Sequence, residues 1–110
     1  MQVLSSDIIR GHIDAIVLST LYFESKYGVE IRDAISIKTN GLYVPNEQSL
    51  YSAFHRLERE GFIEGRWGDI TEGAKRKYYS ITSEGKNYFT SLKAEWENSK
   101  SLIDILIKEA

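Results

Sequence analysis

The sequence predicts a mainly α-helical (α+β) fold: a winged helix-turn-helix followed by one long C-terminal helix. The first observation behind this is a short amphipathic helical pattern at residues 46–61 that runs directly into two strand-like segments. The second is a helical pattern from Ser83 to about Lys108. We therefore expect a winged-helix, DNA-binding domain at residues 1–82 and a C-terminal dimerisation helix at residues 83–110.

A first helix is predicted from Asp7 to Glu24, with Ser5 or Ser6 as its N-cap. Its apolar residues keep helical spacing and form a broad surface, which indicates more than one packing neighbour: Ile9, Ile13, Ile16, Val17 and Leu21. A shorter helix at Val29–Ile37 follows, with Ile31 and Ile35 directed inward, and Asn40-Gly41 ends it. Leu42–Val44, before Pro45, predicts a short strand.

The third helix is the clearest element of the sequence. Asn46 is a suitable N-cap and Gly61 a suitable C-terminal stop. Four apolar residues recur at i, i+3, i+4 and i+7 and so share one face: Leu50, Ala53, Phe54 and Leu57. The opposite face is polar and carries Gln48, Ser52, His55 and Arg59.

A β-hairpin is predicted at residues 62–82, with its turn at Glu72-Gly73. Ile63 and Trp67 share one face of the first strand, and Tyr79 and Ile81 share one face of the second. These faces are expected to cover the third helix. Three consecutive cations then lie near the hairpin tip, at Lys75, Arg76 and Lys77.

The C-terminal helix has an apolar seam in steps of three or four residues: Phe89, Leu92, Trp96, Ser99, Ile103 and Leu106. Its predicted length of about 39 Å, at ~1.5 Å per residue, exceeds what a small domain can cover. Leu102 and Ile105 widen the apolar face, so an isolated chain exposes a large patch. Homodimerisation through this seam is the simplest way to cover it.

Composition limits the possible functions. The 110 residues include no cysteine, which excludes disulfides and thiolate chemistry, and the absence of a secretory signal predicts a cytoplasmic protein. The apolar run from Ile13 to Phe23 is too short to span a membrane. The net charge of −2 and pI of 5.7 oppose nucleic-acid binding by the molecule as a whole, so any DNA contact depends on local cations.

Four segments in this order and spacing resemble the PadR family of bacterial transcriptional regulators: RGHIDAIVLSTL, YGVEI, SLYSAFHRLEREGFIE and KRKYYSITSEG. The single C-terminal helix with Trp96 resembles the small, multidrug-binding subfamily known from a lactococcal repressor. This resemblance implies a homodimeric repressor that binds an inverted-repeat operator and responds to a ligand.

Winged-helix geometry places the N-terminal half of the third helix in the DNA major groove. Gln48, Ser49 and Ser52 are then candidates for base edges or phosphates, and Tyr51 and Arg56 for phosphates. The resemblance assigns DNA contact to the positions of Asn46, Ser49, Tyr51 and Arg56, and the wing to those of Lys75, Arg76 and Lys77. His55 stands where relatives commonly have lysine. Without the wing and the resemblance, this polar face reads as an ordinary solvated helix surface.

Trp96 lies in the middle of the seam, where two symmetry-related indoles could hold a flat aromatic ligand. Further lining residues are predicted to be Asp14, Leu18, Phe89 and Leu92. The alternative is that Trp96 simply fills the interface.

No enzyme, metal site or cofactor is expected. His12 and His55 lie on different helices without a ligand cluster, and no nucleophile motif or phosphate-binding loop is present in the sequence. A rival function is a winged-helix protein-interaction module that does not bind DNA. The acidic pI favours it, as do the six acidic residues that match the six basic ones in residues 46–80.

Overall fold

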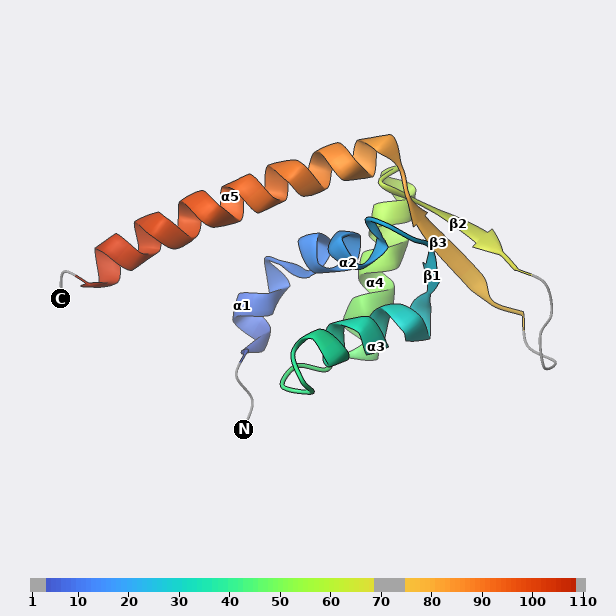
Figure 1. The fold of residues 1–110 in the computed structure, drawn as a ribbon, viewed down its shortest axis with the longest axis horizontal. Helices are drawn as coiled ribbons and strands as arrows, with labels where there is room; N and C mark the ends of the chain where they lie inside the picture. Colours follow the sequence, from blue (N-terminus) through green and yellow to red (C-terminus); the bar gives the residue numbers. More distant parts are fainter. Residues whose placement is uncertain (1–3, 69–74, 109–110) are drawn as a thin grey trace.

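A computed structural model describes residues 4–68 and 75–108. It contains a helical head with a small sheet, from which one long helix extends outward (Figure 1). The molecule measures 57 × 34 × 21 Å as a result. The elements, in chain order, are α1 Ser6–Arg10, α2 Ile13–Leu21, β1 Lys26–Tyr27, α3 Gly28–Lys38, α4 Glu47–Arg59, β2 Ile63–Trp67, β3 Lys77–Ile81 and α5 Ser83–Lys108.

The predicted first helix is two helices. Ser5 caps α1, since its hydroxyl accepts a hydrogen bond from the Ile8 N–H at 3.3 Å. The chain then breaks at Gly11 and His12, and α2 ends at Leu21 instead of continuing to Glu24. The prediction of one helix over residues 7–24 was wrong because the apolar spacing continues across the break and hides it.

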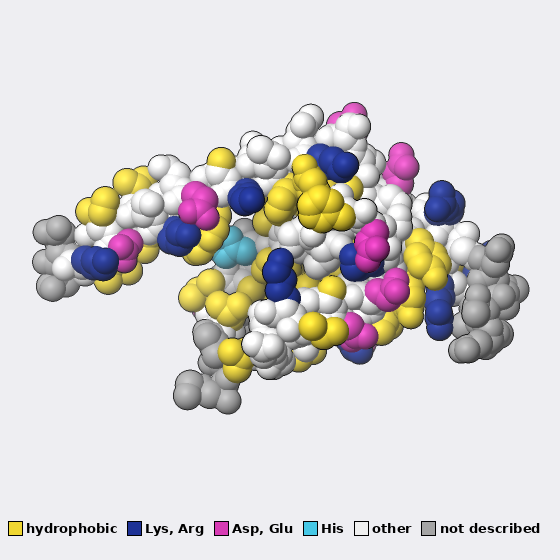
Figure 2. All heavy atoms as spheres, viewed as in Figure 1, with side chains coloured by type: hydrophobic (Ala, Val, Ile, Leu, Met, Phe, Trp, Pro, Cys, Tyr) yellow, Lys and Arg dark blue, Asp and Glu magenta, His cyan; other side chains and the backbone are white. Residues whose placement is uncertain are grey.

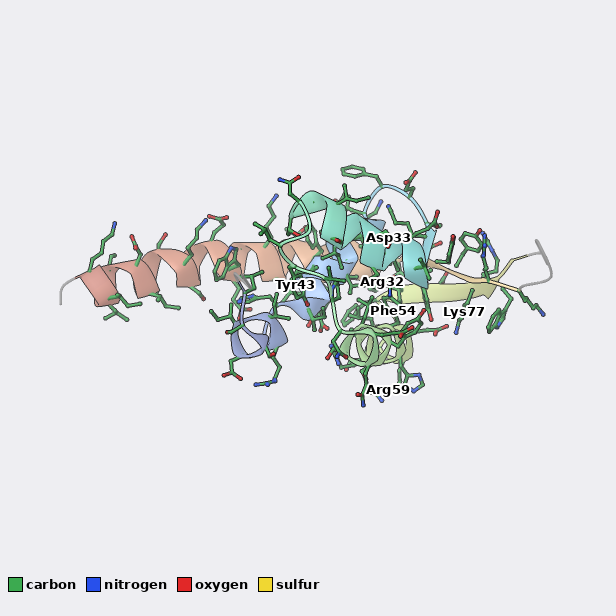
Figure 3. The ribbon with its side chains drawn as sticks, turned by 90° about the horizontal axis from the view of Figure 1, so that it is seen from below. Arg32, Asp33, Tyr43, Phe54, Arg59 and Lys77 are labelled. Atoms are coloured by element: carbon green, nitrogen blue, oxygen red, sulfur yellow. The ribbon has the colours of Figure 1, made fainter. Side chains whose placement is uncertain are left out.

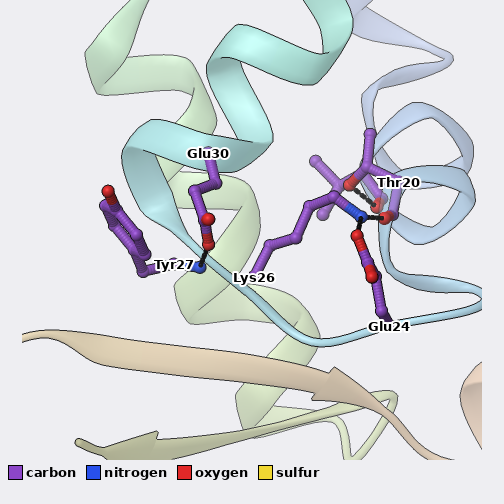
Figure 4. Close-up of polar contacts among 6 residues, drawn as sticks. Thr20, Glu24, Lys26, Tyr27 and Glu30 are labelled. Carbon is purple, nitrogen blue, oxygen red and sulfur yellow. Dashed lines mark hydrogen bonds and ion pairs between the residues drawn. The ribbon is translucent and has the colours of Figure 1, made fainter.

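The short helix α3 confirms the prediction for Val29–Ile37, extended by one residue at each end. The Glu30 carboxylate caps its first turn by accepting a hydrogen bond from the Tyr27 N–H at 3.1 Å (Figure 4). Before it, Lys26 donates to the Thr20 carbonyl at 2.5 Å, which ties β1 to α2.

The strand predicted at Leu42–Val44 is absent, and this segment is an irregular connection. The Thr39 hydroxyl holds it by accepting from the Tyr43 N–H at 3.1 Å and donating to the Tyr43 carbonyl at 3.3 Å. These local bonds use the backbone groups that a strand would need for its partner.

Helix α4 agrees with its prediction. The Asn46 side chain accepts a hydrogen bond from the Ser49 N–H at 3.1 Å, and Gly61 adopts a positive φ of 83° just after the helix. The four predicted apolar residues are fully buried and contribute to a core shared with α2, α3 and the sheet. Its other face lies in solvent.

The sheet is antiparallel in the order β1-β3-β2, with Ile63 paired to Ile81 and Trp67 to Lys77. Ile63 and Tyr79 lie in the core, but Trp67 is 58% exposed. The expectation that Trp67 covers α4 was wrong because the hairpin extends beyond the core at that end (Figure 1). The turn predicted at Glu72-Gly73 lies outside the described residues.

Helix α5 confirms the predicted long C-terminal helix. Its first turns pack on the head through Tyr88, Phe89 and Leu92. The remainder projects away from the head and carries apolar side chains interspersed with charges of both signs (Figure 2). The division into domains at residues 82 and 83 stays a prediction.

Candidate nucleic-acid interface

The solvent face of α4 is polar along its length. Figure 3 shows Phe54 pointing from α4 into the head, while Arg59 points away from it. A shallow groove of about 530 Å³ follows this face and brings together most of the predicted DNA-contacting residues of the helix. Its lining is Gln48, Tyr51, Ser52, His55, Arg56 and Arg59. Asn46 and Ser49 are also exposed, at the N-terminal end of the helix.

Tyr51 is held by packing and still reaches solvent. Its ring contacts Phe54 edge-on at 5.1 Å between centroids. Its hydroxyl lies directly over Gly28, where a Cβ atom would overlap it. The glycine at the start of α3 therefore allows α3 and α4 to approach closely at this tyrosine. A side chain at this position of the YGVEI segment would displace the Tyr51 hydroxyl.

Arg56 lines the groove on the exposed face of α4 and has a charged partner on another helix. Its guanidinium forms an ion pair with Asp14 of α2, and the same carboxylate accepts a hydrogen bond from the Tyr88 hydroxyl at 3.1 Å. Burial is the main reason that the pKa of Tyr88 is raised, so this hydroxyl keeps its proton. Arg56 is thus an arginine with a fixed partner at the edge of the exposed face.

The wing is defined here as the β2–β3 hairpin, and three consecutive cations lie at or just before the start of β3. These three cations have three different environments. Lys77 donates to the Glu58 carboxylate of α4 at 2.9 Å, and this hydrogen bond is the largest cause of its raised pKa. Arg76 stacks on the Tyr27 ring at 4.7 Å. Lys75 is exposed and lies 5.8 Å from the Trp67 ring. Lys75 is therefore the cation of this cluster with the most open surroundings.

Sequence reasoning missed the residues that hold the wing in place. Glu58 accepts hydrogen bonds from Lys77 and also from the Gly65 N–H at 3.2 Å, and so connects α4 to both strands. Trp67 was expected in the core and instead lies at the surface near Lys75 and Lys77. The alternation of apolar residues could not reveal this, because it defines a face of the strand but not where the core ends.

Comparison with known proteins identifies the family. The model of the PadR-like family of transcriptional regulators matches residues 17–91, which include most of the head and the first turns of α5. The chain belongs to the PadR family. Its winged-helix fold and its class, a transcriptional regulator with a DNA-binding fold, follow from this match and confirm the family predicted from the sequence.

Individual relatives agree with the PadR assignment. The chain is 48% identical to a transcriptional regulator from Clostridium thermocellum, with a TM-score of 0.86 over 93% of this chain and 96% of that one. A PadR family transcription regulator from Clostridium difficile is 29% identical, with a TM-score of 0.73 over 87% and 98% of the two chains. An uncharacterized protein from Lysinibacillus sphaericus is 46% identical over 103 residues, 94% of each chain.

The structure brings only part of the predicted ligand-lining set of this PadR protein together: Asp14 and Leu92 line one hollow of about 660 Å³, and the lining of that hollow does not include Leu18, Phe89 or Trp96. Leu18 is 0% exposed in the core and presents no surface to a ligand, because α2 is covered on that side by the head. Asp14 is engaged by Arg56 and Tyr88. Phe89 and Leu92 pack on their own head, and Trp96 is 41% exposed.

The predicted dimer residues divide into two groups. Phe89 and Leu92 pack on the head, and Ser99 is half-buried. Trp96, Ile103 and Leu106 lie on the projecting part of α5 and are exposed, up to 75% at Leu106. Trp96 also contacts His12, edge-on at 4.7 Å, a neighbour that the sequence did not indicate.

Within the described residues, no three His, Asp or Glu side chains gather where they could hold a metal ion. The helices of the same part of the chain are too short or too polar to cross a membrane.

Proposed function

We propose that this PadR protein is a cytoplasmic transcriptional repressor that binds an inverted-repeat operator as a homodimer. The observation that carries the proposal is the polar, solvent-facing side of α4 beside a wing that presents Lys75. A helix presented in this way fits the DNA major groove, and a wing cation fits the adjacent phosphates. The family match supports transcriptional regulation as the setting.

In this proposal the N-terminal half of α4 reads the operator. Gln48, Ser49 and Ser52 are exposed and face base edges or phosphates. The residues that flank them contact the sugar-phosphate backbone of the DNA: Asn46, Tyr51, His55 and Arg56. The wing contributes Lys75 directly, while Arg76 and Lys77 also set the hairpin's orientation through Tyr27 and Glu58.

The projecting half of α5 is the proposed dimerisation surface. Its exposed apolar side chains include Leu102, Ile103, Ile105, Leu106 and Ile107, which form a larger apolar surface than one helix in water normally carries. A second copy of α5 would cover it, and two-fold symmetry would then present two heads to the two halves of an inverted repeat.

The test of the DNA-binding proposal starts with selection of duplexes from a random pool. The enriched sequence is expected to be an inverted repeat, and its affinity is expected to fall steeply as the salt concentration rises, because phosphate contacts release counterions. Failure to enrich any sequence would favour the rival function, a protein-interaction module, to which the acidic pI of 5.7 points.

A ligand pocket near Trp96 at the dimer interface is part of the same proposal. Lys100 lies 6.0 Å from the indole and Glu97 pairs with Lys100 at 3.1 Å, so both signs of charge are close to it. Flat aromatic compounds should quench the emission of wild-type protein. The variant Trp96→Ala, which retains Trp67, should lose this quenching. Unchanged quenching in the variant would contradict a ligand pocket beside Trp96.

A further inference from the structure

One carboxylate connects the DNA-facing helix to the C-terminal helix. Asp14 of α2 forms an ion pair through Oδ1 with Arg56 of α4. Its other oxygen, Oδ2, accepts a hydrogen bond from the Tyr88 hydroxyl of α5 at 3.1 Å. Arg56 and Tyr88 lie 42 and 74 residues from Asp14 in the sequence. The three side chains therefore join three separate elements at a single point.

Two members of this cluster are fixed by their surroundings. Asp14 sits on α2, whose Val17 and Leu21 are buried in the core. The Tyr88 ring stacks on Phe62, with centroids 4.2 Å apart and planes inclined by 18°. Because the ring and the helix are both packed, the hydroxyl and the carboxylate meet in a defined geometry.

Arg56 lies between two surfaces. It lines the groove on the exposed face of α4 with His55 and Arg59, and also a hollow of about 660 Å³ between α1, α4 and α5 in which Asp14 and Tyr88 lie. A guanidinium carries five N–H donors in a planar fork, so one nitrogen can bind Asp14 while others remain for a phosphate oxygen. Holding such a side chain in place lowers the entropy lost when it binds.

We propose that Asp14 is a positioning residue for DNA binding, which holds Arg56 for a phosphate contact, and that Tyr88 makes this position depend on α5. The inference rests on the proposed function and deepens it. The α5 helix also carries the proposed dimer and ligand surface, so a shift of α5 moves Tyr88, reorients the Asp14 carboxylate and changes the phosphate contact of Arg56.

Tyr88→Phe tests the proposal without changing any charge, and it keeps the ring that stacks on Phe62. Loss of the one hydrogen bond should lower affinity for the selected duplex about two- to tenfold. The same substitution should leave affinity unchanged when Arg56 is already Gln, because there is no guanidinium left to position. Tyr22→Phe is the matched control, since it removes another tyrosine hydroxyl where the end of α2 meets α5, and its ring lies 5.5 Å from that of Phe89.

A purely structural role for Tyr88 predicts a different pattern. Tyr88→Phe would then lower affinity equally with Arg56 and with Gln at that position, and this result overturns the proposal. So does wild-type affinity for Tyr88→Phe. A second cycle uses Asp14→Ala, which removes both side-chain oxygens, so that adding Tyr88→Phe should have no further effect on affinity. Absence of any selected duplex for the wild-type protein would instead contradict the proposed function itself.

Discussion

Neighbouring cations of the wing have separate roles at the residue scale. Lys77 connects the wing to α4 through its hydrogen bond to Glu58, whereas Lys75 is exposed to solvent. The sequence predicted three consecutive cations near the hairpin tip, and the contacts that each makes in the structure distinguish them. Glu58 lies 19 residues from Lys77, so sequence spacing alone could not pair them.

Lys75→Gln and Lys77→Gln should therefore differ. Loss of Lys75 should leave the free energy of unfolding unchanged. It should also reduce the slope of log affinity against log salt concentration by about 0.9 for each head, or roughly 1.8 for the proposed dimer on two half-sites. Loss of Lys77 should also lower the unfolding free energy by roughly 0.2–1 kcal/mol, as expected for a partly exposed ion pair. Urea titration and DNA titration measure the two effects, with the exposed α5 residue Lys93→Gln as the control. Equal stability of the two wing variants would contradict this distinction.

The Lys77 contact also has a pH dependence of defined sign. Its hydrogen bond to Glu58 raises the folded-state pKa of Lys77 above its ordinary value of 10.5. Its stabilising contribution is therefore complete below that value and is lost as the pH rises through the folded-state pKa. The stability difference between wild type and Lys77→Gln should be constant around neutral pH and shrink in alkaline solution. A difference that grows with alkalinity would contradict the assignment.

At the scale of elements, α4, the hairpin and α5 could be predicted because each has its own periodicity and end signals. The break between α1 and α2 and the strand β1 could not. The two-residue strand β1 exists only through pairing with β3, where Lys26 faces Tyr79. The same holds for the site: the polar face of α4 was predictable, but the pairing of Arg56 with Asp14 depends on how three helices pack.

The contact between α5 and the head depends on Gly85. A Cβ atom at this position would overlap the Phe62 carbonyl oxygen, so only glycine allows the first turn of α5 to lie this close. Gly85→Ala should lower the unfolding free energy by about 1–3 kcal/mol, the usual cost of overpacking. Gly11→Ala is the control, because nothing lies within 4 Å of its added Cβ. Thermal unfolding of both variants measures the effect, and equal stability would contradict the role given to Gly85.

At the scale of the whole molecule, apolar side chains are distributed differently over the head and the projecting half of α5. The head has a buried apolar core and some exposed apolar side chains, such as Phe23 and Ile37, whereas the projecting half of α5 exposes a continuous group that includes Ile103 and Leu106. A chain with this distribution of apolar area is more stable when a second copy covers the helix. Dimerisation and the spacing of the two heads would then depend on the same helix.

Ile103→Asp should convert the proposed dimer to a monomer, because it places a charge in the exposed, C-terminal part of the apolar seam. Ser101→Asp adds the same charge to a neighbouring exposed position outside the seam and should leave the dimer intact. Sedimentation equilibrium distinguishes the two states. If the wild-type protein sediments as a monomer at working concentration, this result contradicts the proposed two-fold dimer.

The most direct test of the central claim is the stoichiometry of the complex with DNA, measured by sedimentation on the selected inverted repeat and on a duplex with one half-site scrambled. The proposal predicts two chains on the intact repeat and a large loss of affinity when one half-site is scrambled, because each head binds one half-site. One chain per duplex, with equal affinity for the intact and scrambled sites, would contradict it.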